Sequence, residues 1–148
     1  MGRESCIITV IYKGGSVMIT KSPSGALSPY YYKGGYFHSI HYGSYFDDME
    51  AFFRTMRAEE EFIMKSPQKR RIMIEIFETN MTSDVLAEFA AHIERLSSKI
   101  YKLAISADKK MLKTINKALE KGCSLGSGQM YLAPDQEEAK TWLVSEAY

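Results

Sequence analysis

Three consecutive segments indicate the architecture: Arg71-Ile-Met-Ile-Glu-Ile-Phe77, Thr82-Ser-Asp-Val-Leu-Ala-Glu-Phe-Ala-Ala-His-Ile-Glu-Arg-Leu96 and Ile100-Tyr-Lys-Leu-Ala-Ile-Ser106. The first is almost continuously apolar, which is the pattern of a strand that is covered on both faces. The second has apolar residues at spacings of three and four, so it predicts an amphipathic helix with Thr82 or Ser83 as its N-cap. A strand, a helix and a strand in this order predict two parallel strands joined by a right-handed crossover.

The same alternation continues on both sides of these segments. Upstream, the residues from Tyr36 to Tyr42 favour a strand, and an amphipathic helix begins near Asp47 and ends before Ser66-Pro67. Downstream, a helix over 108–121 is followed by a short strand over 129–133 and by a helix that Asp135 caps. Strands that alternate with helices predict an α/β fold whose later strands are parallel.

The first 35 residues have a different pattern. Two β-branched runs, at 7–12 and 16–20, flank Lys13-Gly-Gly15 and predict an antiparallel hairpin. Residues 21–35 contain two prolines and three glycines and predict a loop. We therefore expect one domain over 1–148: a core α/β unit (36–148) with a mixed sheet and helices packed mainly on one side, preceded by an N-terminal β-hairpin (1–20) that makes the sheet mixed.

The composition excludes several classes of protein. The chain has 148 residues, of which 45% are hydrophobic and 25% are charged, so global disorder is excluded. Its net charge is +1, which provides no uniform field for a nucleic-acid backbone. No run approaches the ~20 apolar residues of a membrane span, and the apolar run near the N-terminus is too short for a signal peptide. Two cysteines, Cys6 and Cys123, are typical of reduced thiols, so we expect a cytoplasmic protein.

Three segments, one of them within the first strand described above, carry a family resemblance: Ile40-His-Tyr-Gly43, Ile72-Met-Ile-Glu-Ile-Phe77 and Met130-Tyr-Leu-Ala-Pro-Asp-Gln-Glu-Glu-Ala-Lys-Thr-Trp-Leu-Val144. Residues 36–148 resemble the STAS-like proteins related to bacterial anti-sigma-factor antagonists, and the last segment is similar to that family's closing strand and helix. The resemblance implies a mixed sheet with helices mainly on one side. It also implies a non-enzymatic role, either in regulated protein–protein binding or in holding a small ligand.

The resemblance also points to two hydroxyl side chains. In the family's anti-sigma-factor antagonists, a kinase phosphorylates a serine or threonine at the start of the helix after the central strand, which here corresponds to Thr82 and Ser83. The family's Asp-Ser-Ser-Gly-type motif is absent, since Asp84 and Val85 follow these residues. A phosphate there would meet unpaired helix amides, and the same hydroxyls would also serve as an ordinary N-cap. Both interpretations stand at this point.

Aromatic residues are concentrated between positions 30 and 46, where Lys33 is the only lysine or arginine. So few cations argue against single-stranded nucleic acid and favour an interface or an apolar pocket wall. The ligand or interface candidates are Tyr31, Tyr36, Tyr42, Tyr45, Phe53 and Phe89. An alternative function is therefore a carrier or sensor of a small apolar, lipid-like ligand, for which a closed cavity lined by Phe53, Phe89 and tyrosines would be the evidence.

Charge is distributed unevenly along the chain. Residues 99–121 carry seven lysines and two acidic residues, whereas residues 47–61 carry six acidic residues and two arginines. Such a dipolar surface suits a protein partner or self-association, although solvated helix faces carry charge in any case. The exposed edge of the hairpin also favours a homodimer formed by strand pairing.

The sequence offers little for catalysis, cofactors or metals. His38 and His41 would point to opposite faces of a strand, without a cysteine or an acidic residue at ligand spacing. The glycine-rich segment Gly122–Gly128 follows a helix and precedes a strand, which is the reverse of a phosphate-binding loop. We therefore expect a protein that is not an enzyme and has no cofactor.

Overall fold

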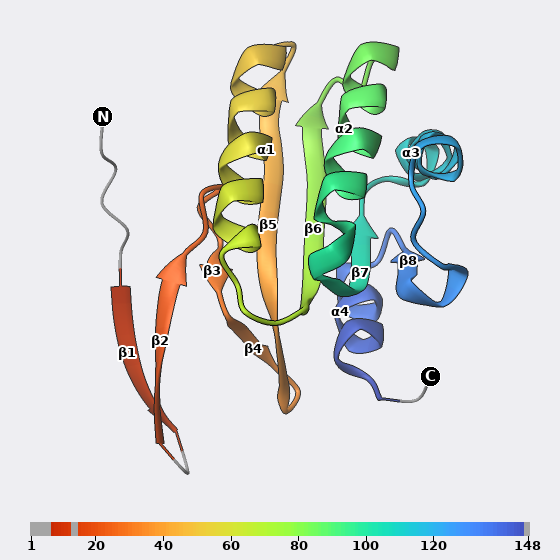
Figure 1. The fold of residues 1–148 in the computed structure, drawn as a ribbon. Coiled ribbons are helices and arrows are strands. Elements are labelled where there is room, and N and C mark those ends of the chain that lie inside the picture. The colour runs from red at the N-terminus through yellow and green to blue at the C-terminus, as the bar shows by residue number, and fades with distance from the viewer. Residues whose placement is uncertain (1–6, 13–14, 147–148) are drawn as a thin grey trace.

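The structure is a computed structural model that describes residues 7–12 and 15–146. Its strands and helices form two sheets with four helices around the larger one (Figure 1). In chain order the elements are β1 (Ile7–Tyr12), β2 (Gly15–Lys21), β3 (Leu27–Ser28), β4 (Tyr30–Tyr32), β5 (Gly35–Phe46), α1 (Met49–Met64), β6 (Arg70–Thr79), α2 (Ser83–Leu96), β7 (Ile100–Ser106), α3 (Lys109–Gly122), β8 (Met130–Leu132) and α4 (Gln136–Val144).

The larger sheet is mixed and has the strand order β4-β5-β6-β7-β8. Strands β5 to β8 are parallel to one another, as the sequence predicts, and β4 is antiparallel to β5. Because the parallel strands lie in chain order, each strand–helix unit adds the next strand on the same side of the sheet. This order brings the carboxyl ends of β5 to β8 together at one end of the sheet.

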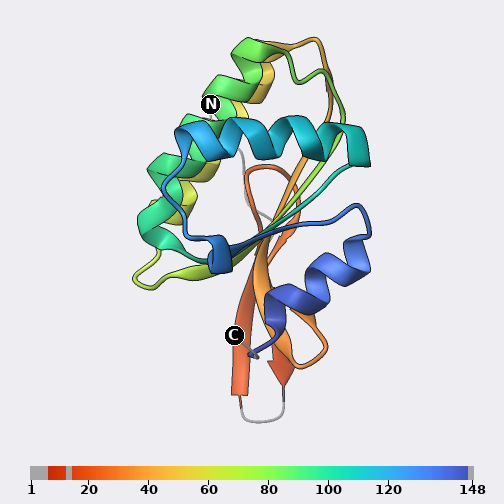
Figure 2. The same cartoon turned by 90° about the vertical axis from the view of Figure 1, so that its right-hand side faces the viewer.

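Helices cover both faces of this sheet, and three of the four lie toward one face (Figure 2). The main core contains buried side chains of α1, α2 and α3 together with Ile72, Ile74 and Ile76 of β6. The alternating position Met73 faces the other way and packs with Ala139 and Leu143 of α4. Strand β6 is thus covered on both faces, which explains its almost continuous apolar sequence. Among the described residues, no helix is both long enough and apolar enough to cross a membrane.

Each helix begins with a side-chain cap directly after a strand. In each case the side chain of the N-cap residue accepts a backbone N–H from the first turn of the helix. These residues are Asp48 for α1, Thr82 for α2, Asp108 for α3 and Asp135 for α4. Such caps satisfy amides that have no partner within the helix. Since each helix follows a parallel strand, all four helix N-termini lie at the carboxyl end of the sheet.

The N-terminal strands differ from the expectation. Strands β1 and β2 pair antiparallel, and the expected turn at Lys13-Gly14 lies outside the described residues. Together with β3 they form a separate three-stranded sheet, so the expectation that they make the main sheet mixed is wrong. The antiparallel strand of the main sheet is β4, which lies in the segment 21–35 that the sequence predicts to be a loop.

A tight turn explains why β4 joins the main sheet. Tyr32 pairs with Gly35, so only Lys33 and Gly34 connect β4 to β5. Both residues have positive φ, +47° and +85°, as in a type I′ hairpin turn. Glycine has no steric penalty there, and the three tyrosines of β4 are good strand formers.

Strand β5 extends to Phe46, past the expected end at Tyr42, through an irregularity between Gly43 and Phe46. A Cβ on Gly43 would lie 2.2 Å from the ring of Phe77, so glycine allows that ring to lie over β5. The irregularity places Tyr45 against Phe52 of α1, with ring centroids 5.0 Å apart.

Candidate functional site

The two phosphorylation candidates lie at the first turn of α2, at the carboxyl end of β6. Thr82 is the N-cap, and its Oγ1 accepts the backbone N–H of Val85 at 3.4 Å. Ser83 is the first residue of the helix, and both side chains are exposed. Thr82 therefore has the capping role that the sequence allowed, while Ser83 is open to solvent beside it.

A groove of about 460 Å³ runs between α2 and α3, and Ser83 is one of its lining residues. Its apolar lining consists of small and medium side chains, namely Leu86, Ala87, Ala90, Ala91 and Ala118. Lys117 and Lys121 of α3 also line it. A Cβ on Gly122 would lie 3.0 Å from the Cβ of Ala90, so glycine permits a close approach of the two helices at this point.

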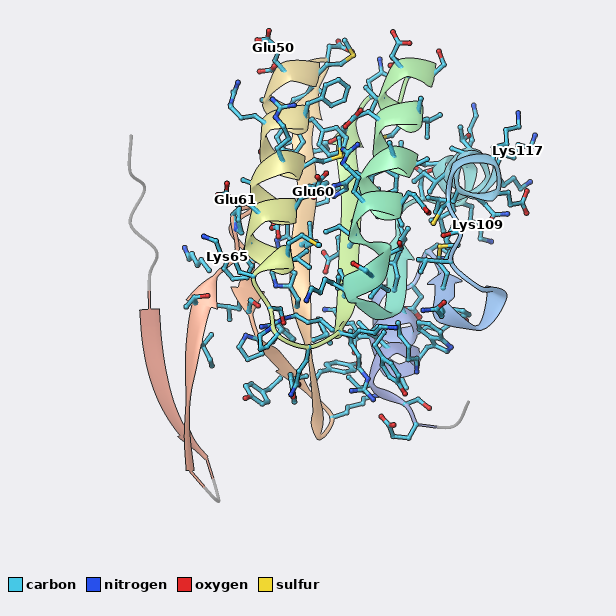
Figure 3. All side chains as sticks on the ribbon, in the orientation of Figure 1. Glu50, Glu60, Glu61, Lys65, Lys109 and Lys117 are labelled. Carbon is cyan, nitrogen blue, oxygen red and sulfur yellow. The ribbon has the colours of Figure 1, made fainter. Side chains whose placement is uncertain are left out.

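The charged helix faces that the sequence predicts lie on opposite sides of the helical layer. Figure 3 shows Glu50 and Glu61 on α1, and Lys109 and Lys117 on α3, with α2 between them. All four side chains are exposed. The groove therefore lies on the basic side of the protein.

The six aromatic candidates do not form one site. Tyr42 and Phe89 are fully buried in the main core, and Tyr45 and Phe53 are partly buried against it. Tyr31 and Tyr36 lie on the β4–β5 hairpin, with their ring centroids 5.6 Å apart. The aromatic-rich segment thus supplies the core and the surface of the hairpin separately.

Sequence reasoning missed a chain of hydrogen bonds that links β5, α1 and α2. The hydroxyl of Tyr42 lies 2.8 Å from Nε2 of His92, and Nδ1 of His92 donates to Glu60 at 2.7 Å. Arg95 donates two hydrogen bonds to the same carboxylate, each at 2.9 Å. Burial raises the pKa of Tyr42 well above its ordinary value, so this hydroxyl keeps its proton and donates to His92.

This chain predicts acid sensitivity through Glu60. Burial acts to raise the pKa of this carboxyl group, but hydrogen bonds from His92 and Arg95 outweigh it and lower the pKa from 4.5 to about 2. A lowered carboxyl pKa stabilises the fold above pH 4.5, and the stabilisation is lost as the pH falls from 4.5 towards 2. We expect a Glu60→Gln variant to lose about 2 kcal/mol of unfolding free energy at pH 7 and to show a flatter pH dependence in that window. Urea unfolding across a pH series measures both effects.

The neighbouring exposed residue provides the control for that experiment. Glu61→Gln removes the same charge from the same helix, but Glu61 is exposed to solvent. This variant should keep the wild-type pH dependence. Equal pH profiles for wild type and Glu60→Gln would contradict the role given to Glu60.

A second buried polar chain joins the segment before β4 to α1. Nε2 of His38 donates to Oε1 of Glu59 at 2.8 Å, and Nδ1 of His38 lies 2.7 Å from the hydroxyl of Ser28. Oε2 of Glu59 accepts the backbone N–H of Ser24 at 3.0 Å. His38 and Glu59 have no exposed side-chain area, and Ser28 is 4% exposed.

The order serine, histidine and acid resembles a nucleophilic site, but burial gives it another role. A nucleophile must reach a substrate, whereas the Ser28 hydroxyl lies inside the protein. The chain instead attaches residues 22–28 to α1. Helical spacing is the signal that could have found Glu59, because it is on one face with Phe52, Met56 and Ile63.

The described part of the chain contains neither a cysteine with a lowered pKa nor a metal site. Burial raises the pKa of the Cys123 thiol, which disfavours the nucleophilic thiolate, and Cys6 lies outside the described residues. Within residues 7–12 and 15–146, no group of three or more histidine, cysteine, aspartate or glutamate side chains is placed to hold a metal ion. No family model, no curated protein and no solved structure matches this chain.

Proposed function

We propose that this protein is a non-catalytic regulatory module, STAS-like and similar in action to anti-sigma-factor antagonists, that binds a partner protein in the groove between α2 and α3. One observation carries the proposal: the apolar groove has the exposed Ser83 in its lining, next to the capping residue Thr82. The resemblance of residues 36–148 to the STAS-like family supports the same helix as the regulated element.

The groove favours an acidic, amphipathic helix of the partner as its occupant. The alanines and Leu86 offer a shallow apolar surface on which leucine-sized side chains can pack. Lys117 and Lys121 line the same groove, and the α3 sequence has five lysines and one glutamate. Acidic residues that flank an apolar stripe would complement this charge and orient the partner.

Phosphorylation of Ser83 would act as the switch. A phosphoserine carries ≈ −1.5 to −2 charges at pH 7, and the unpaired amides at the start of α2 would stabilise it. Its charge would lie in the lining that the acidic partner must occupy. Phosphorylation should therefore release the partner by repulsion, without a change of fold.

Binding of a designed peptide tests this proposal. The probe is a fluorescein-labelled amphipathic helix with leucines on one face and glutamates beside them, and its affinity is measured by fluorescence anisotropy. We expect Ala87→Glu and Ser83→Asp each to weaken binding at least tenfold, which corresponds to about 1.4 kcal/mol, because each places a negative charge in the groove.

Two controls make the result specific. Ala58→Glu introduces the same side chain at an exposed alanine of α1, and it should leave the affinity within about twofold. A peptide with lysines in place of the glutamates should bind more weakly than the acidic one. Equal losses for Ala58→Glu and Ala87→Glu, or a preference for the basic peptide, would exclude the groove as the binding surface.

A further inference from the structure

A second pocket lies at the opposite end of the sheet from Ser83. It has a volume of about 190 Å³ and lies at the amino ends of β5, β6 and β7, at the lower end of the sheet in Figure 1. The lining residues that matter here are Tyr36, Ser66, Lys69, Arg70, Arg71 and Tyr101. This pocket shares no lining residue with the proposed partner groove, and the family resemblance gives it no role.

The pocket is positively charged. Among the described residues that line it, Lys69, Arg70 and Arg71 are basic and none is acidic. Arg71 pairs with Glu146 outside the lining, whereas Lys69 and Arg70 form no ion pair among the described residues, so a bound anion would offset the repulsion between these cations. Guanidinium groups are suited to phosphate and carboxylate, because they donate paired hydrogen bonds in one plane.

Both arginines are held in place by their neighbours. The Ser66 hydroxyl accepts a hydrogen bond from Nε of Arg70 at 3.0 Å. The guanidinium of Arg71 lies 5.0 Å from the ring centroid of Tyr101, and its Nη2 donates to Glu146 near the C-terminus. The Nε of Arg71 is buried and donates to no acceptor among the described residues. Buried donors are almost always satisfied, so this one marks a place where an acceptor is missing.

Two exposed aromatic rings complete the lining. Tyr36 is 52% exposed and Tyr101 is 48% exposed, and they come from strands on either side of β6. Large rings left open beside cations provide an apolar surface on which a flat group can stack. The volume is below the 300–1,000 Å³ of typical drug-sized sites, which limits the ligand to a small molecule.

We propose that this pocket binds a small organic anion in which a phosphate or carboxylate group is attached to a flat ring. Arg70, Arg71 and Lys69 hold the anionic group, and Tyr36 and Tyr101 contact the ring. Phosphate and carboxylate ligands share this chemistry, and the experiment distinguishes between them.

Isothermal titration calorimetry of the full chain tests the site with three probes: phenyl phosphate, benzoate and phenol. We expect one binding site with a dissociation constant in the millimolar range or tighter for at least one of the two anions, and weaker binding of phenol by at least tenfold. The tighter of the two anions identifies the anionic group. Binding of phenol as strong as that of both anions, or no binding of either anion, would overturn the proposal.

Charge-matched variants locate the site. Arg70→Gln and Lys69→Gln should each weaken anion binding, Arg70→Gln by about tenfold or more. Lys109→Gln removes the same charge from the exposed surface of α3, outside the pocket, and should change the affinity by less than about twofold (Figure 3). Lys69 is exposed, so its variant keeps the test decisive if Arg70→Gln fails to fold. Equal losses for Lys69→Gln and Lys109→Gln would place the anion elsewhere.

Discussion

Replacing His38 with alanine is expected to lower the free energy of unfolding by about 3–5 kcal/mol. The variant removes the donor to Glu59, which remains fully buried with the Ser24 amide as its other hydrogen-bond partner. It also removes a ring that stacks on Phe62 with centroids 5.2 Å apart. A buried polar group that loses its partner keeps its desolvation penalty, so the loss exceeds that of one ordinary hydrogen bond. Urea unfolding followed by circular dichroism measures it.

The same strand provides the matched control. His41 is three residues away, its side chain is 44% exposed, and its nearest acidic contact is Glu75 at 3.7 Å. We expect His41→Ala to change the unfolding free energy by no more than about 0.5 kcal/mol. The double variant His38→Leu/Glu59→Leu should recover part of the loss, because it leaves neither a buried carboxylate nor a buried imidazole without a partner, whereas the Ser28 hydroxyl and the Ser24 amide still lose theirs. A loss below about 1 kcal/mol for His38→Ala would show that the buried chain does not stabilise the fold.

The strand–helix units could be predicted from the sequence because their signals are local. Apolar periodicity, an N-cap and a following loop identify α2 within fifteen residues, and the apolar run of β6 indicates cover on both faces. Parallel pairing then follows from the crossover connection. The apolar periodicity, the caps and the apolar runs can be recognised without knowing which distant residues pack against each segment.

Two features could not be predicted from the sequence, because they depend on contacts between residues that are far apart in the chain. Whether β1 and β2 join the main sheet depends on competition for the edge of β5, and β4 occupies that edge through its two-residue turn. The burial of His38, His92 and Glu59 is tolerated because each meets a partner from another element. Residue type alone assigns such side chains to the surface.

The candidate site shows the same limit. The position of Thr82 and Ser83 at a helix start could be predicted from one segment, and the structure places both there. The groove could not be predicted, because it forms only where α3 packs beside α2 and where Gly122 allows the two helices to approach closely. The six aromatic candidates share apolar character and, in most cases, closeness in sequence, but the fold divides them between the main core and the exposed surface of the β4–β5 hairpin.

Phe89 gives the second large effect, and it tests whether these aromatic residues build the core or surround a ligand. The side chain is fully buried, and its ring meets that of Tyr42 edge-on, with centroids 6.5 Å apart. We expect Phe89→Ala to lower the free energy of unfolding by about 3–5 kcal/mol, because it removes apolar area from the main core and leaves a cavity. Urea unfolding of the ligand-free protein measures this loss.

A control variant at an exposed phenylalanine shows whether the loss of stability comes from removing a buried ring or from removing any aromatic ring. Phe46 is 61% exposed at the end of β5, so Phe46→Ala should cost no more than about 0.5 kcal/mol. If Phe89 instead lined a cavity that a ligand fills, the ligand-free protein would already lack the contacts that alanine removes. The variant would then cost less than about 1 kcal/mol, and only the stabilisation by an added apolar ligand would fall. A large loss in the ligand-free protein therefore assigns Phe89 to the packed core and counts against a ligand cavity beside this ring.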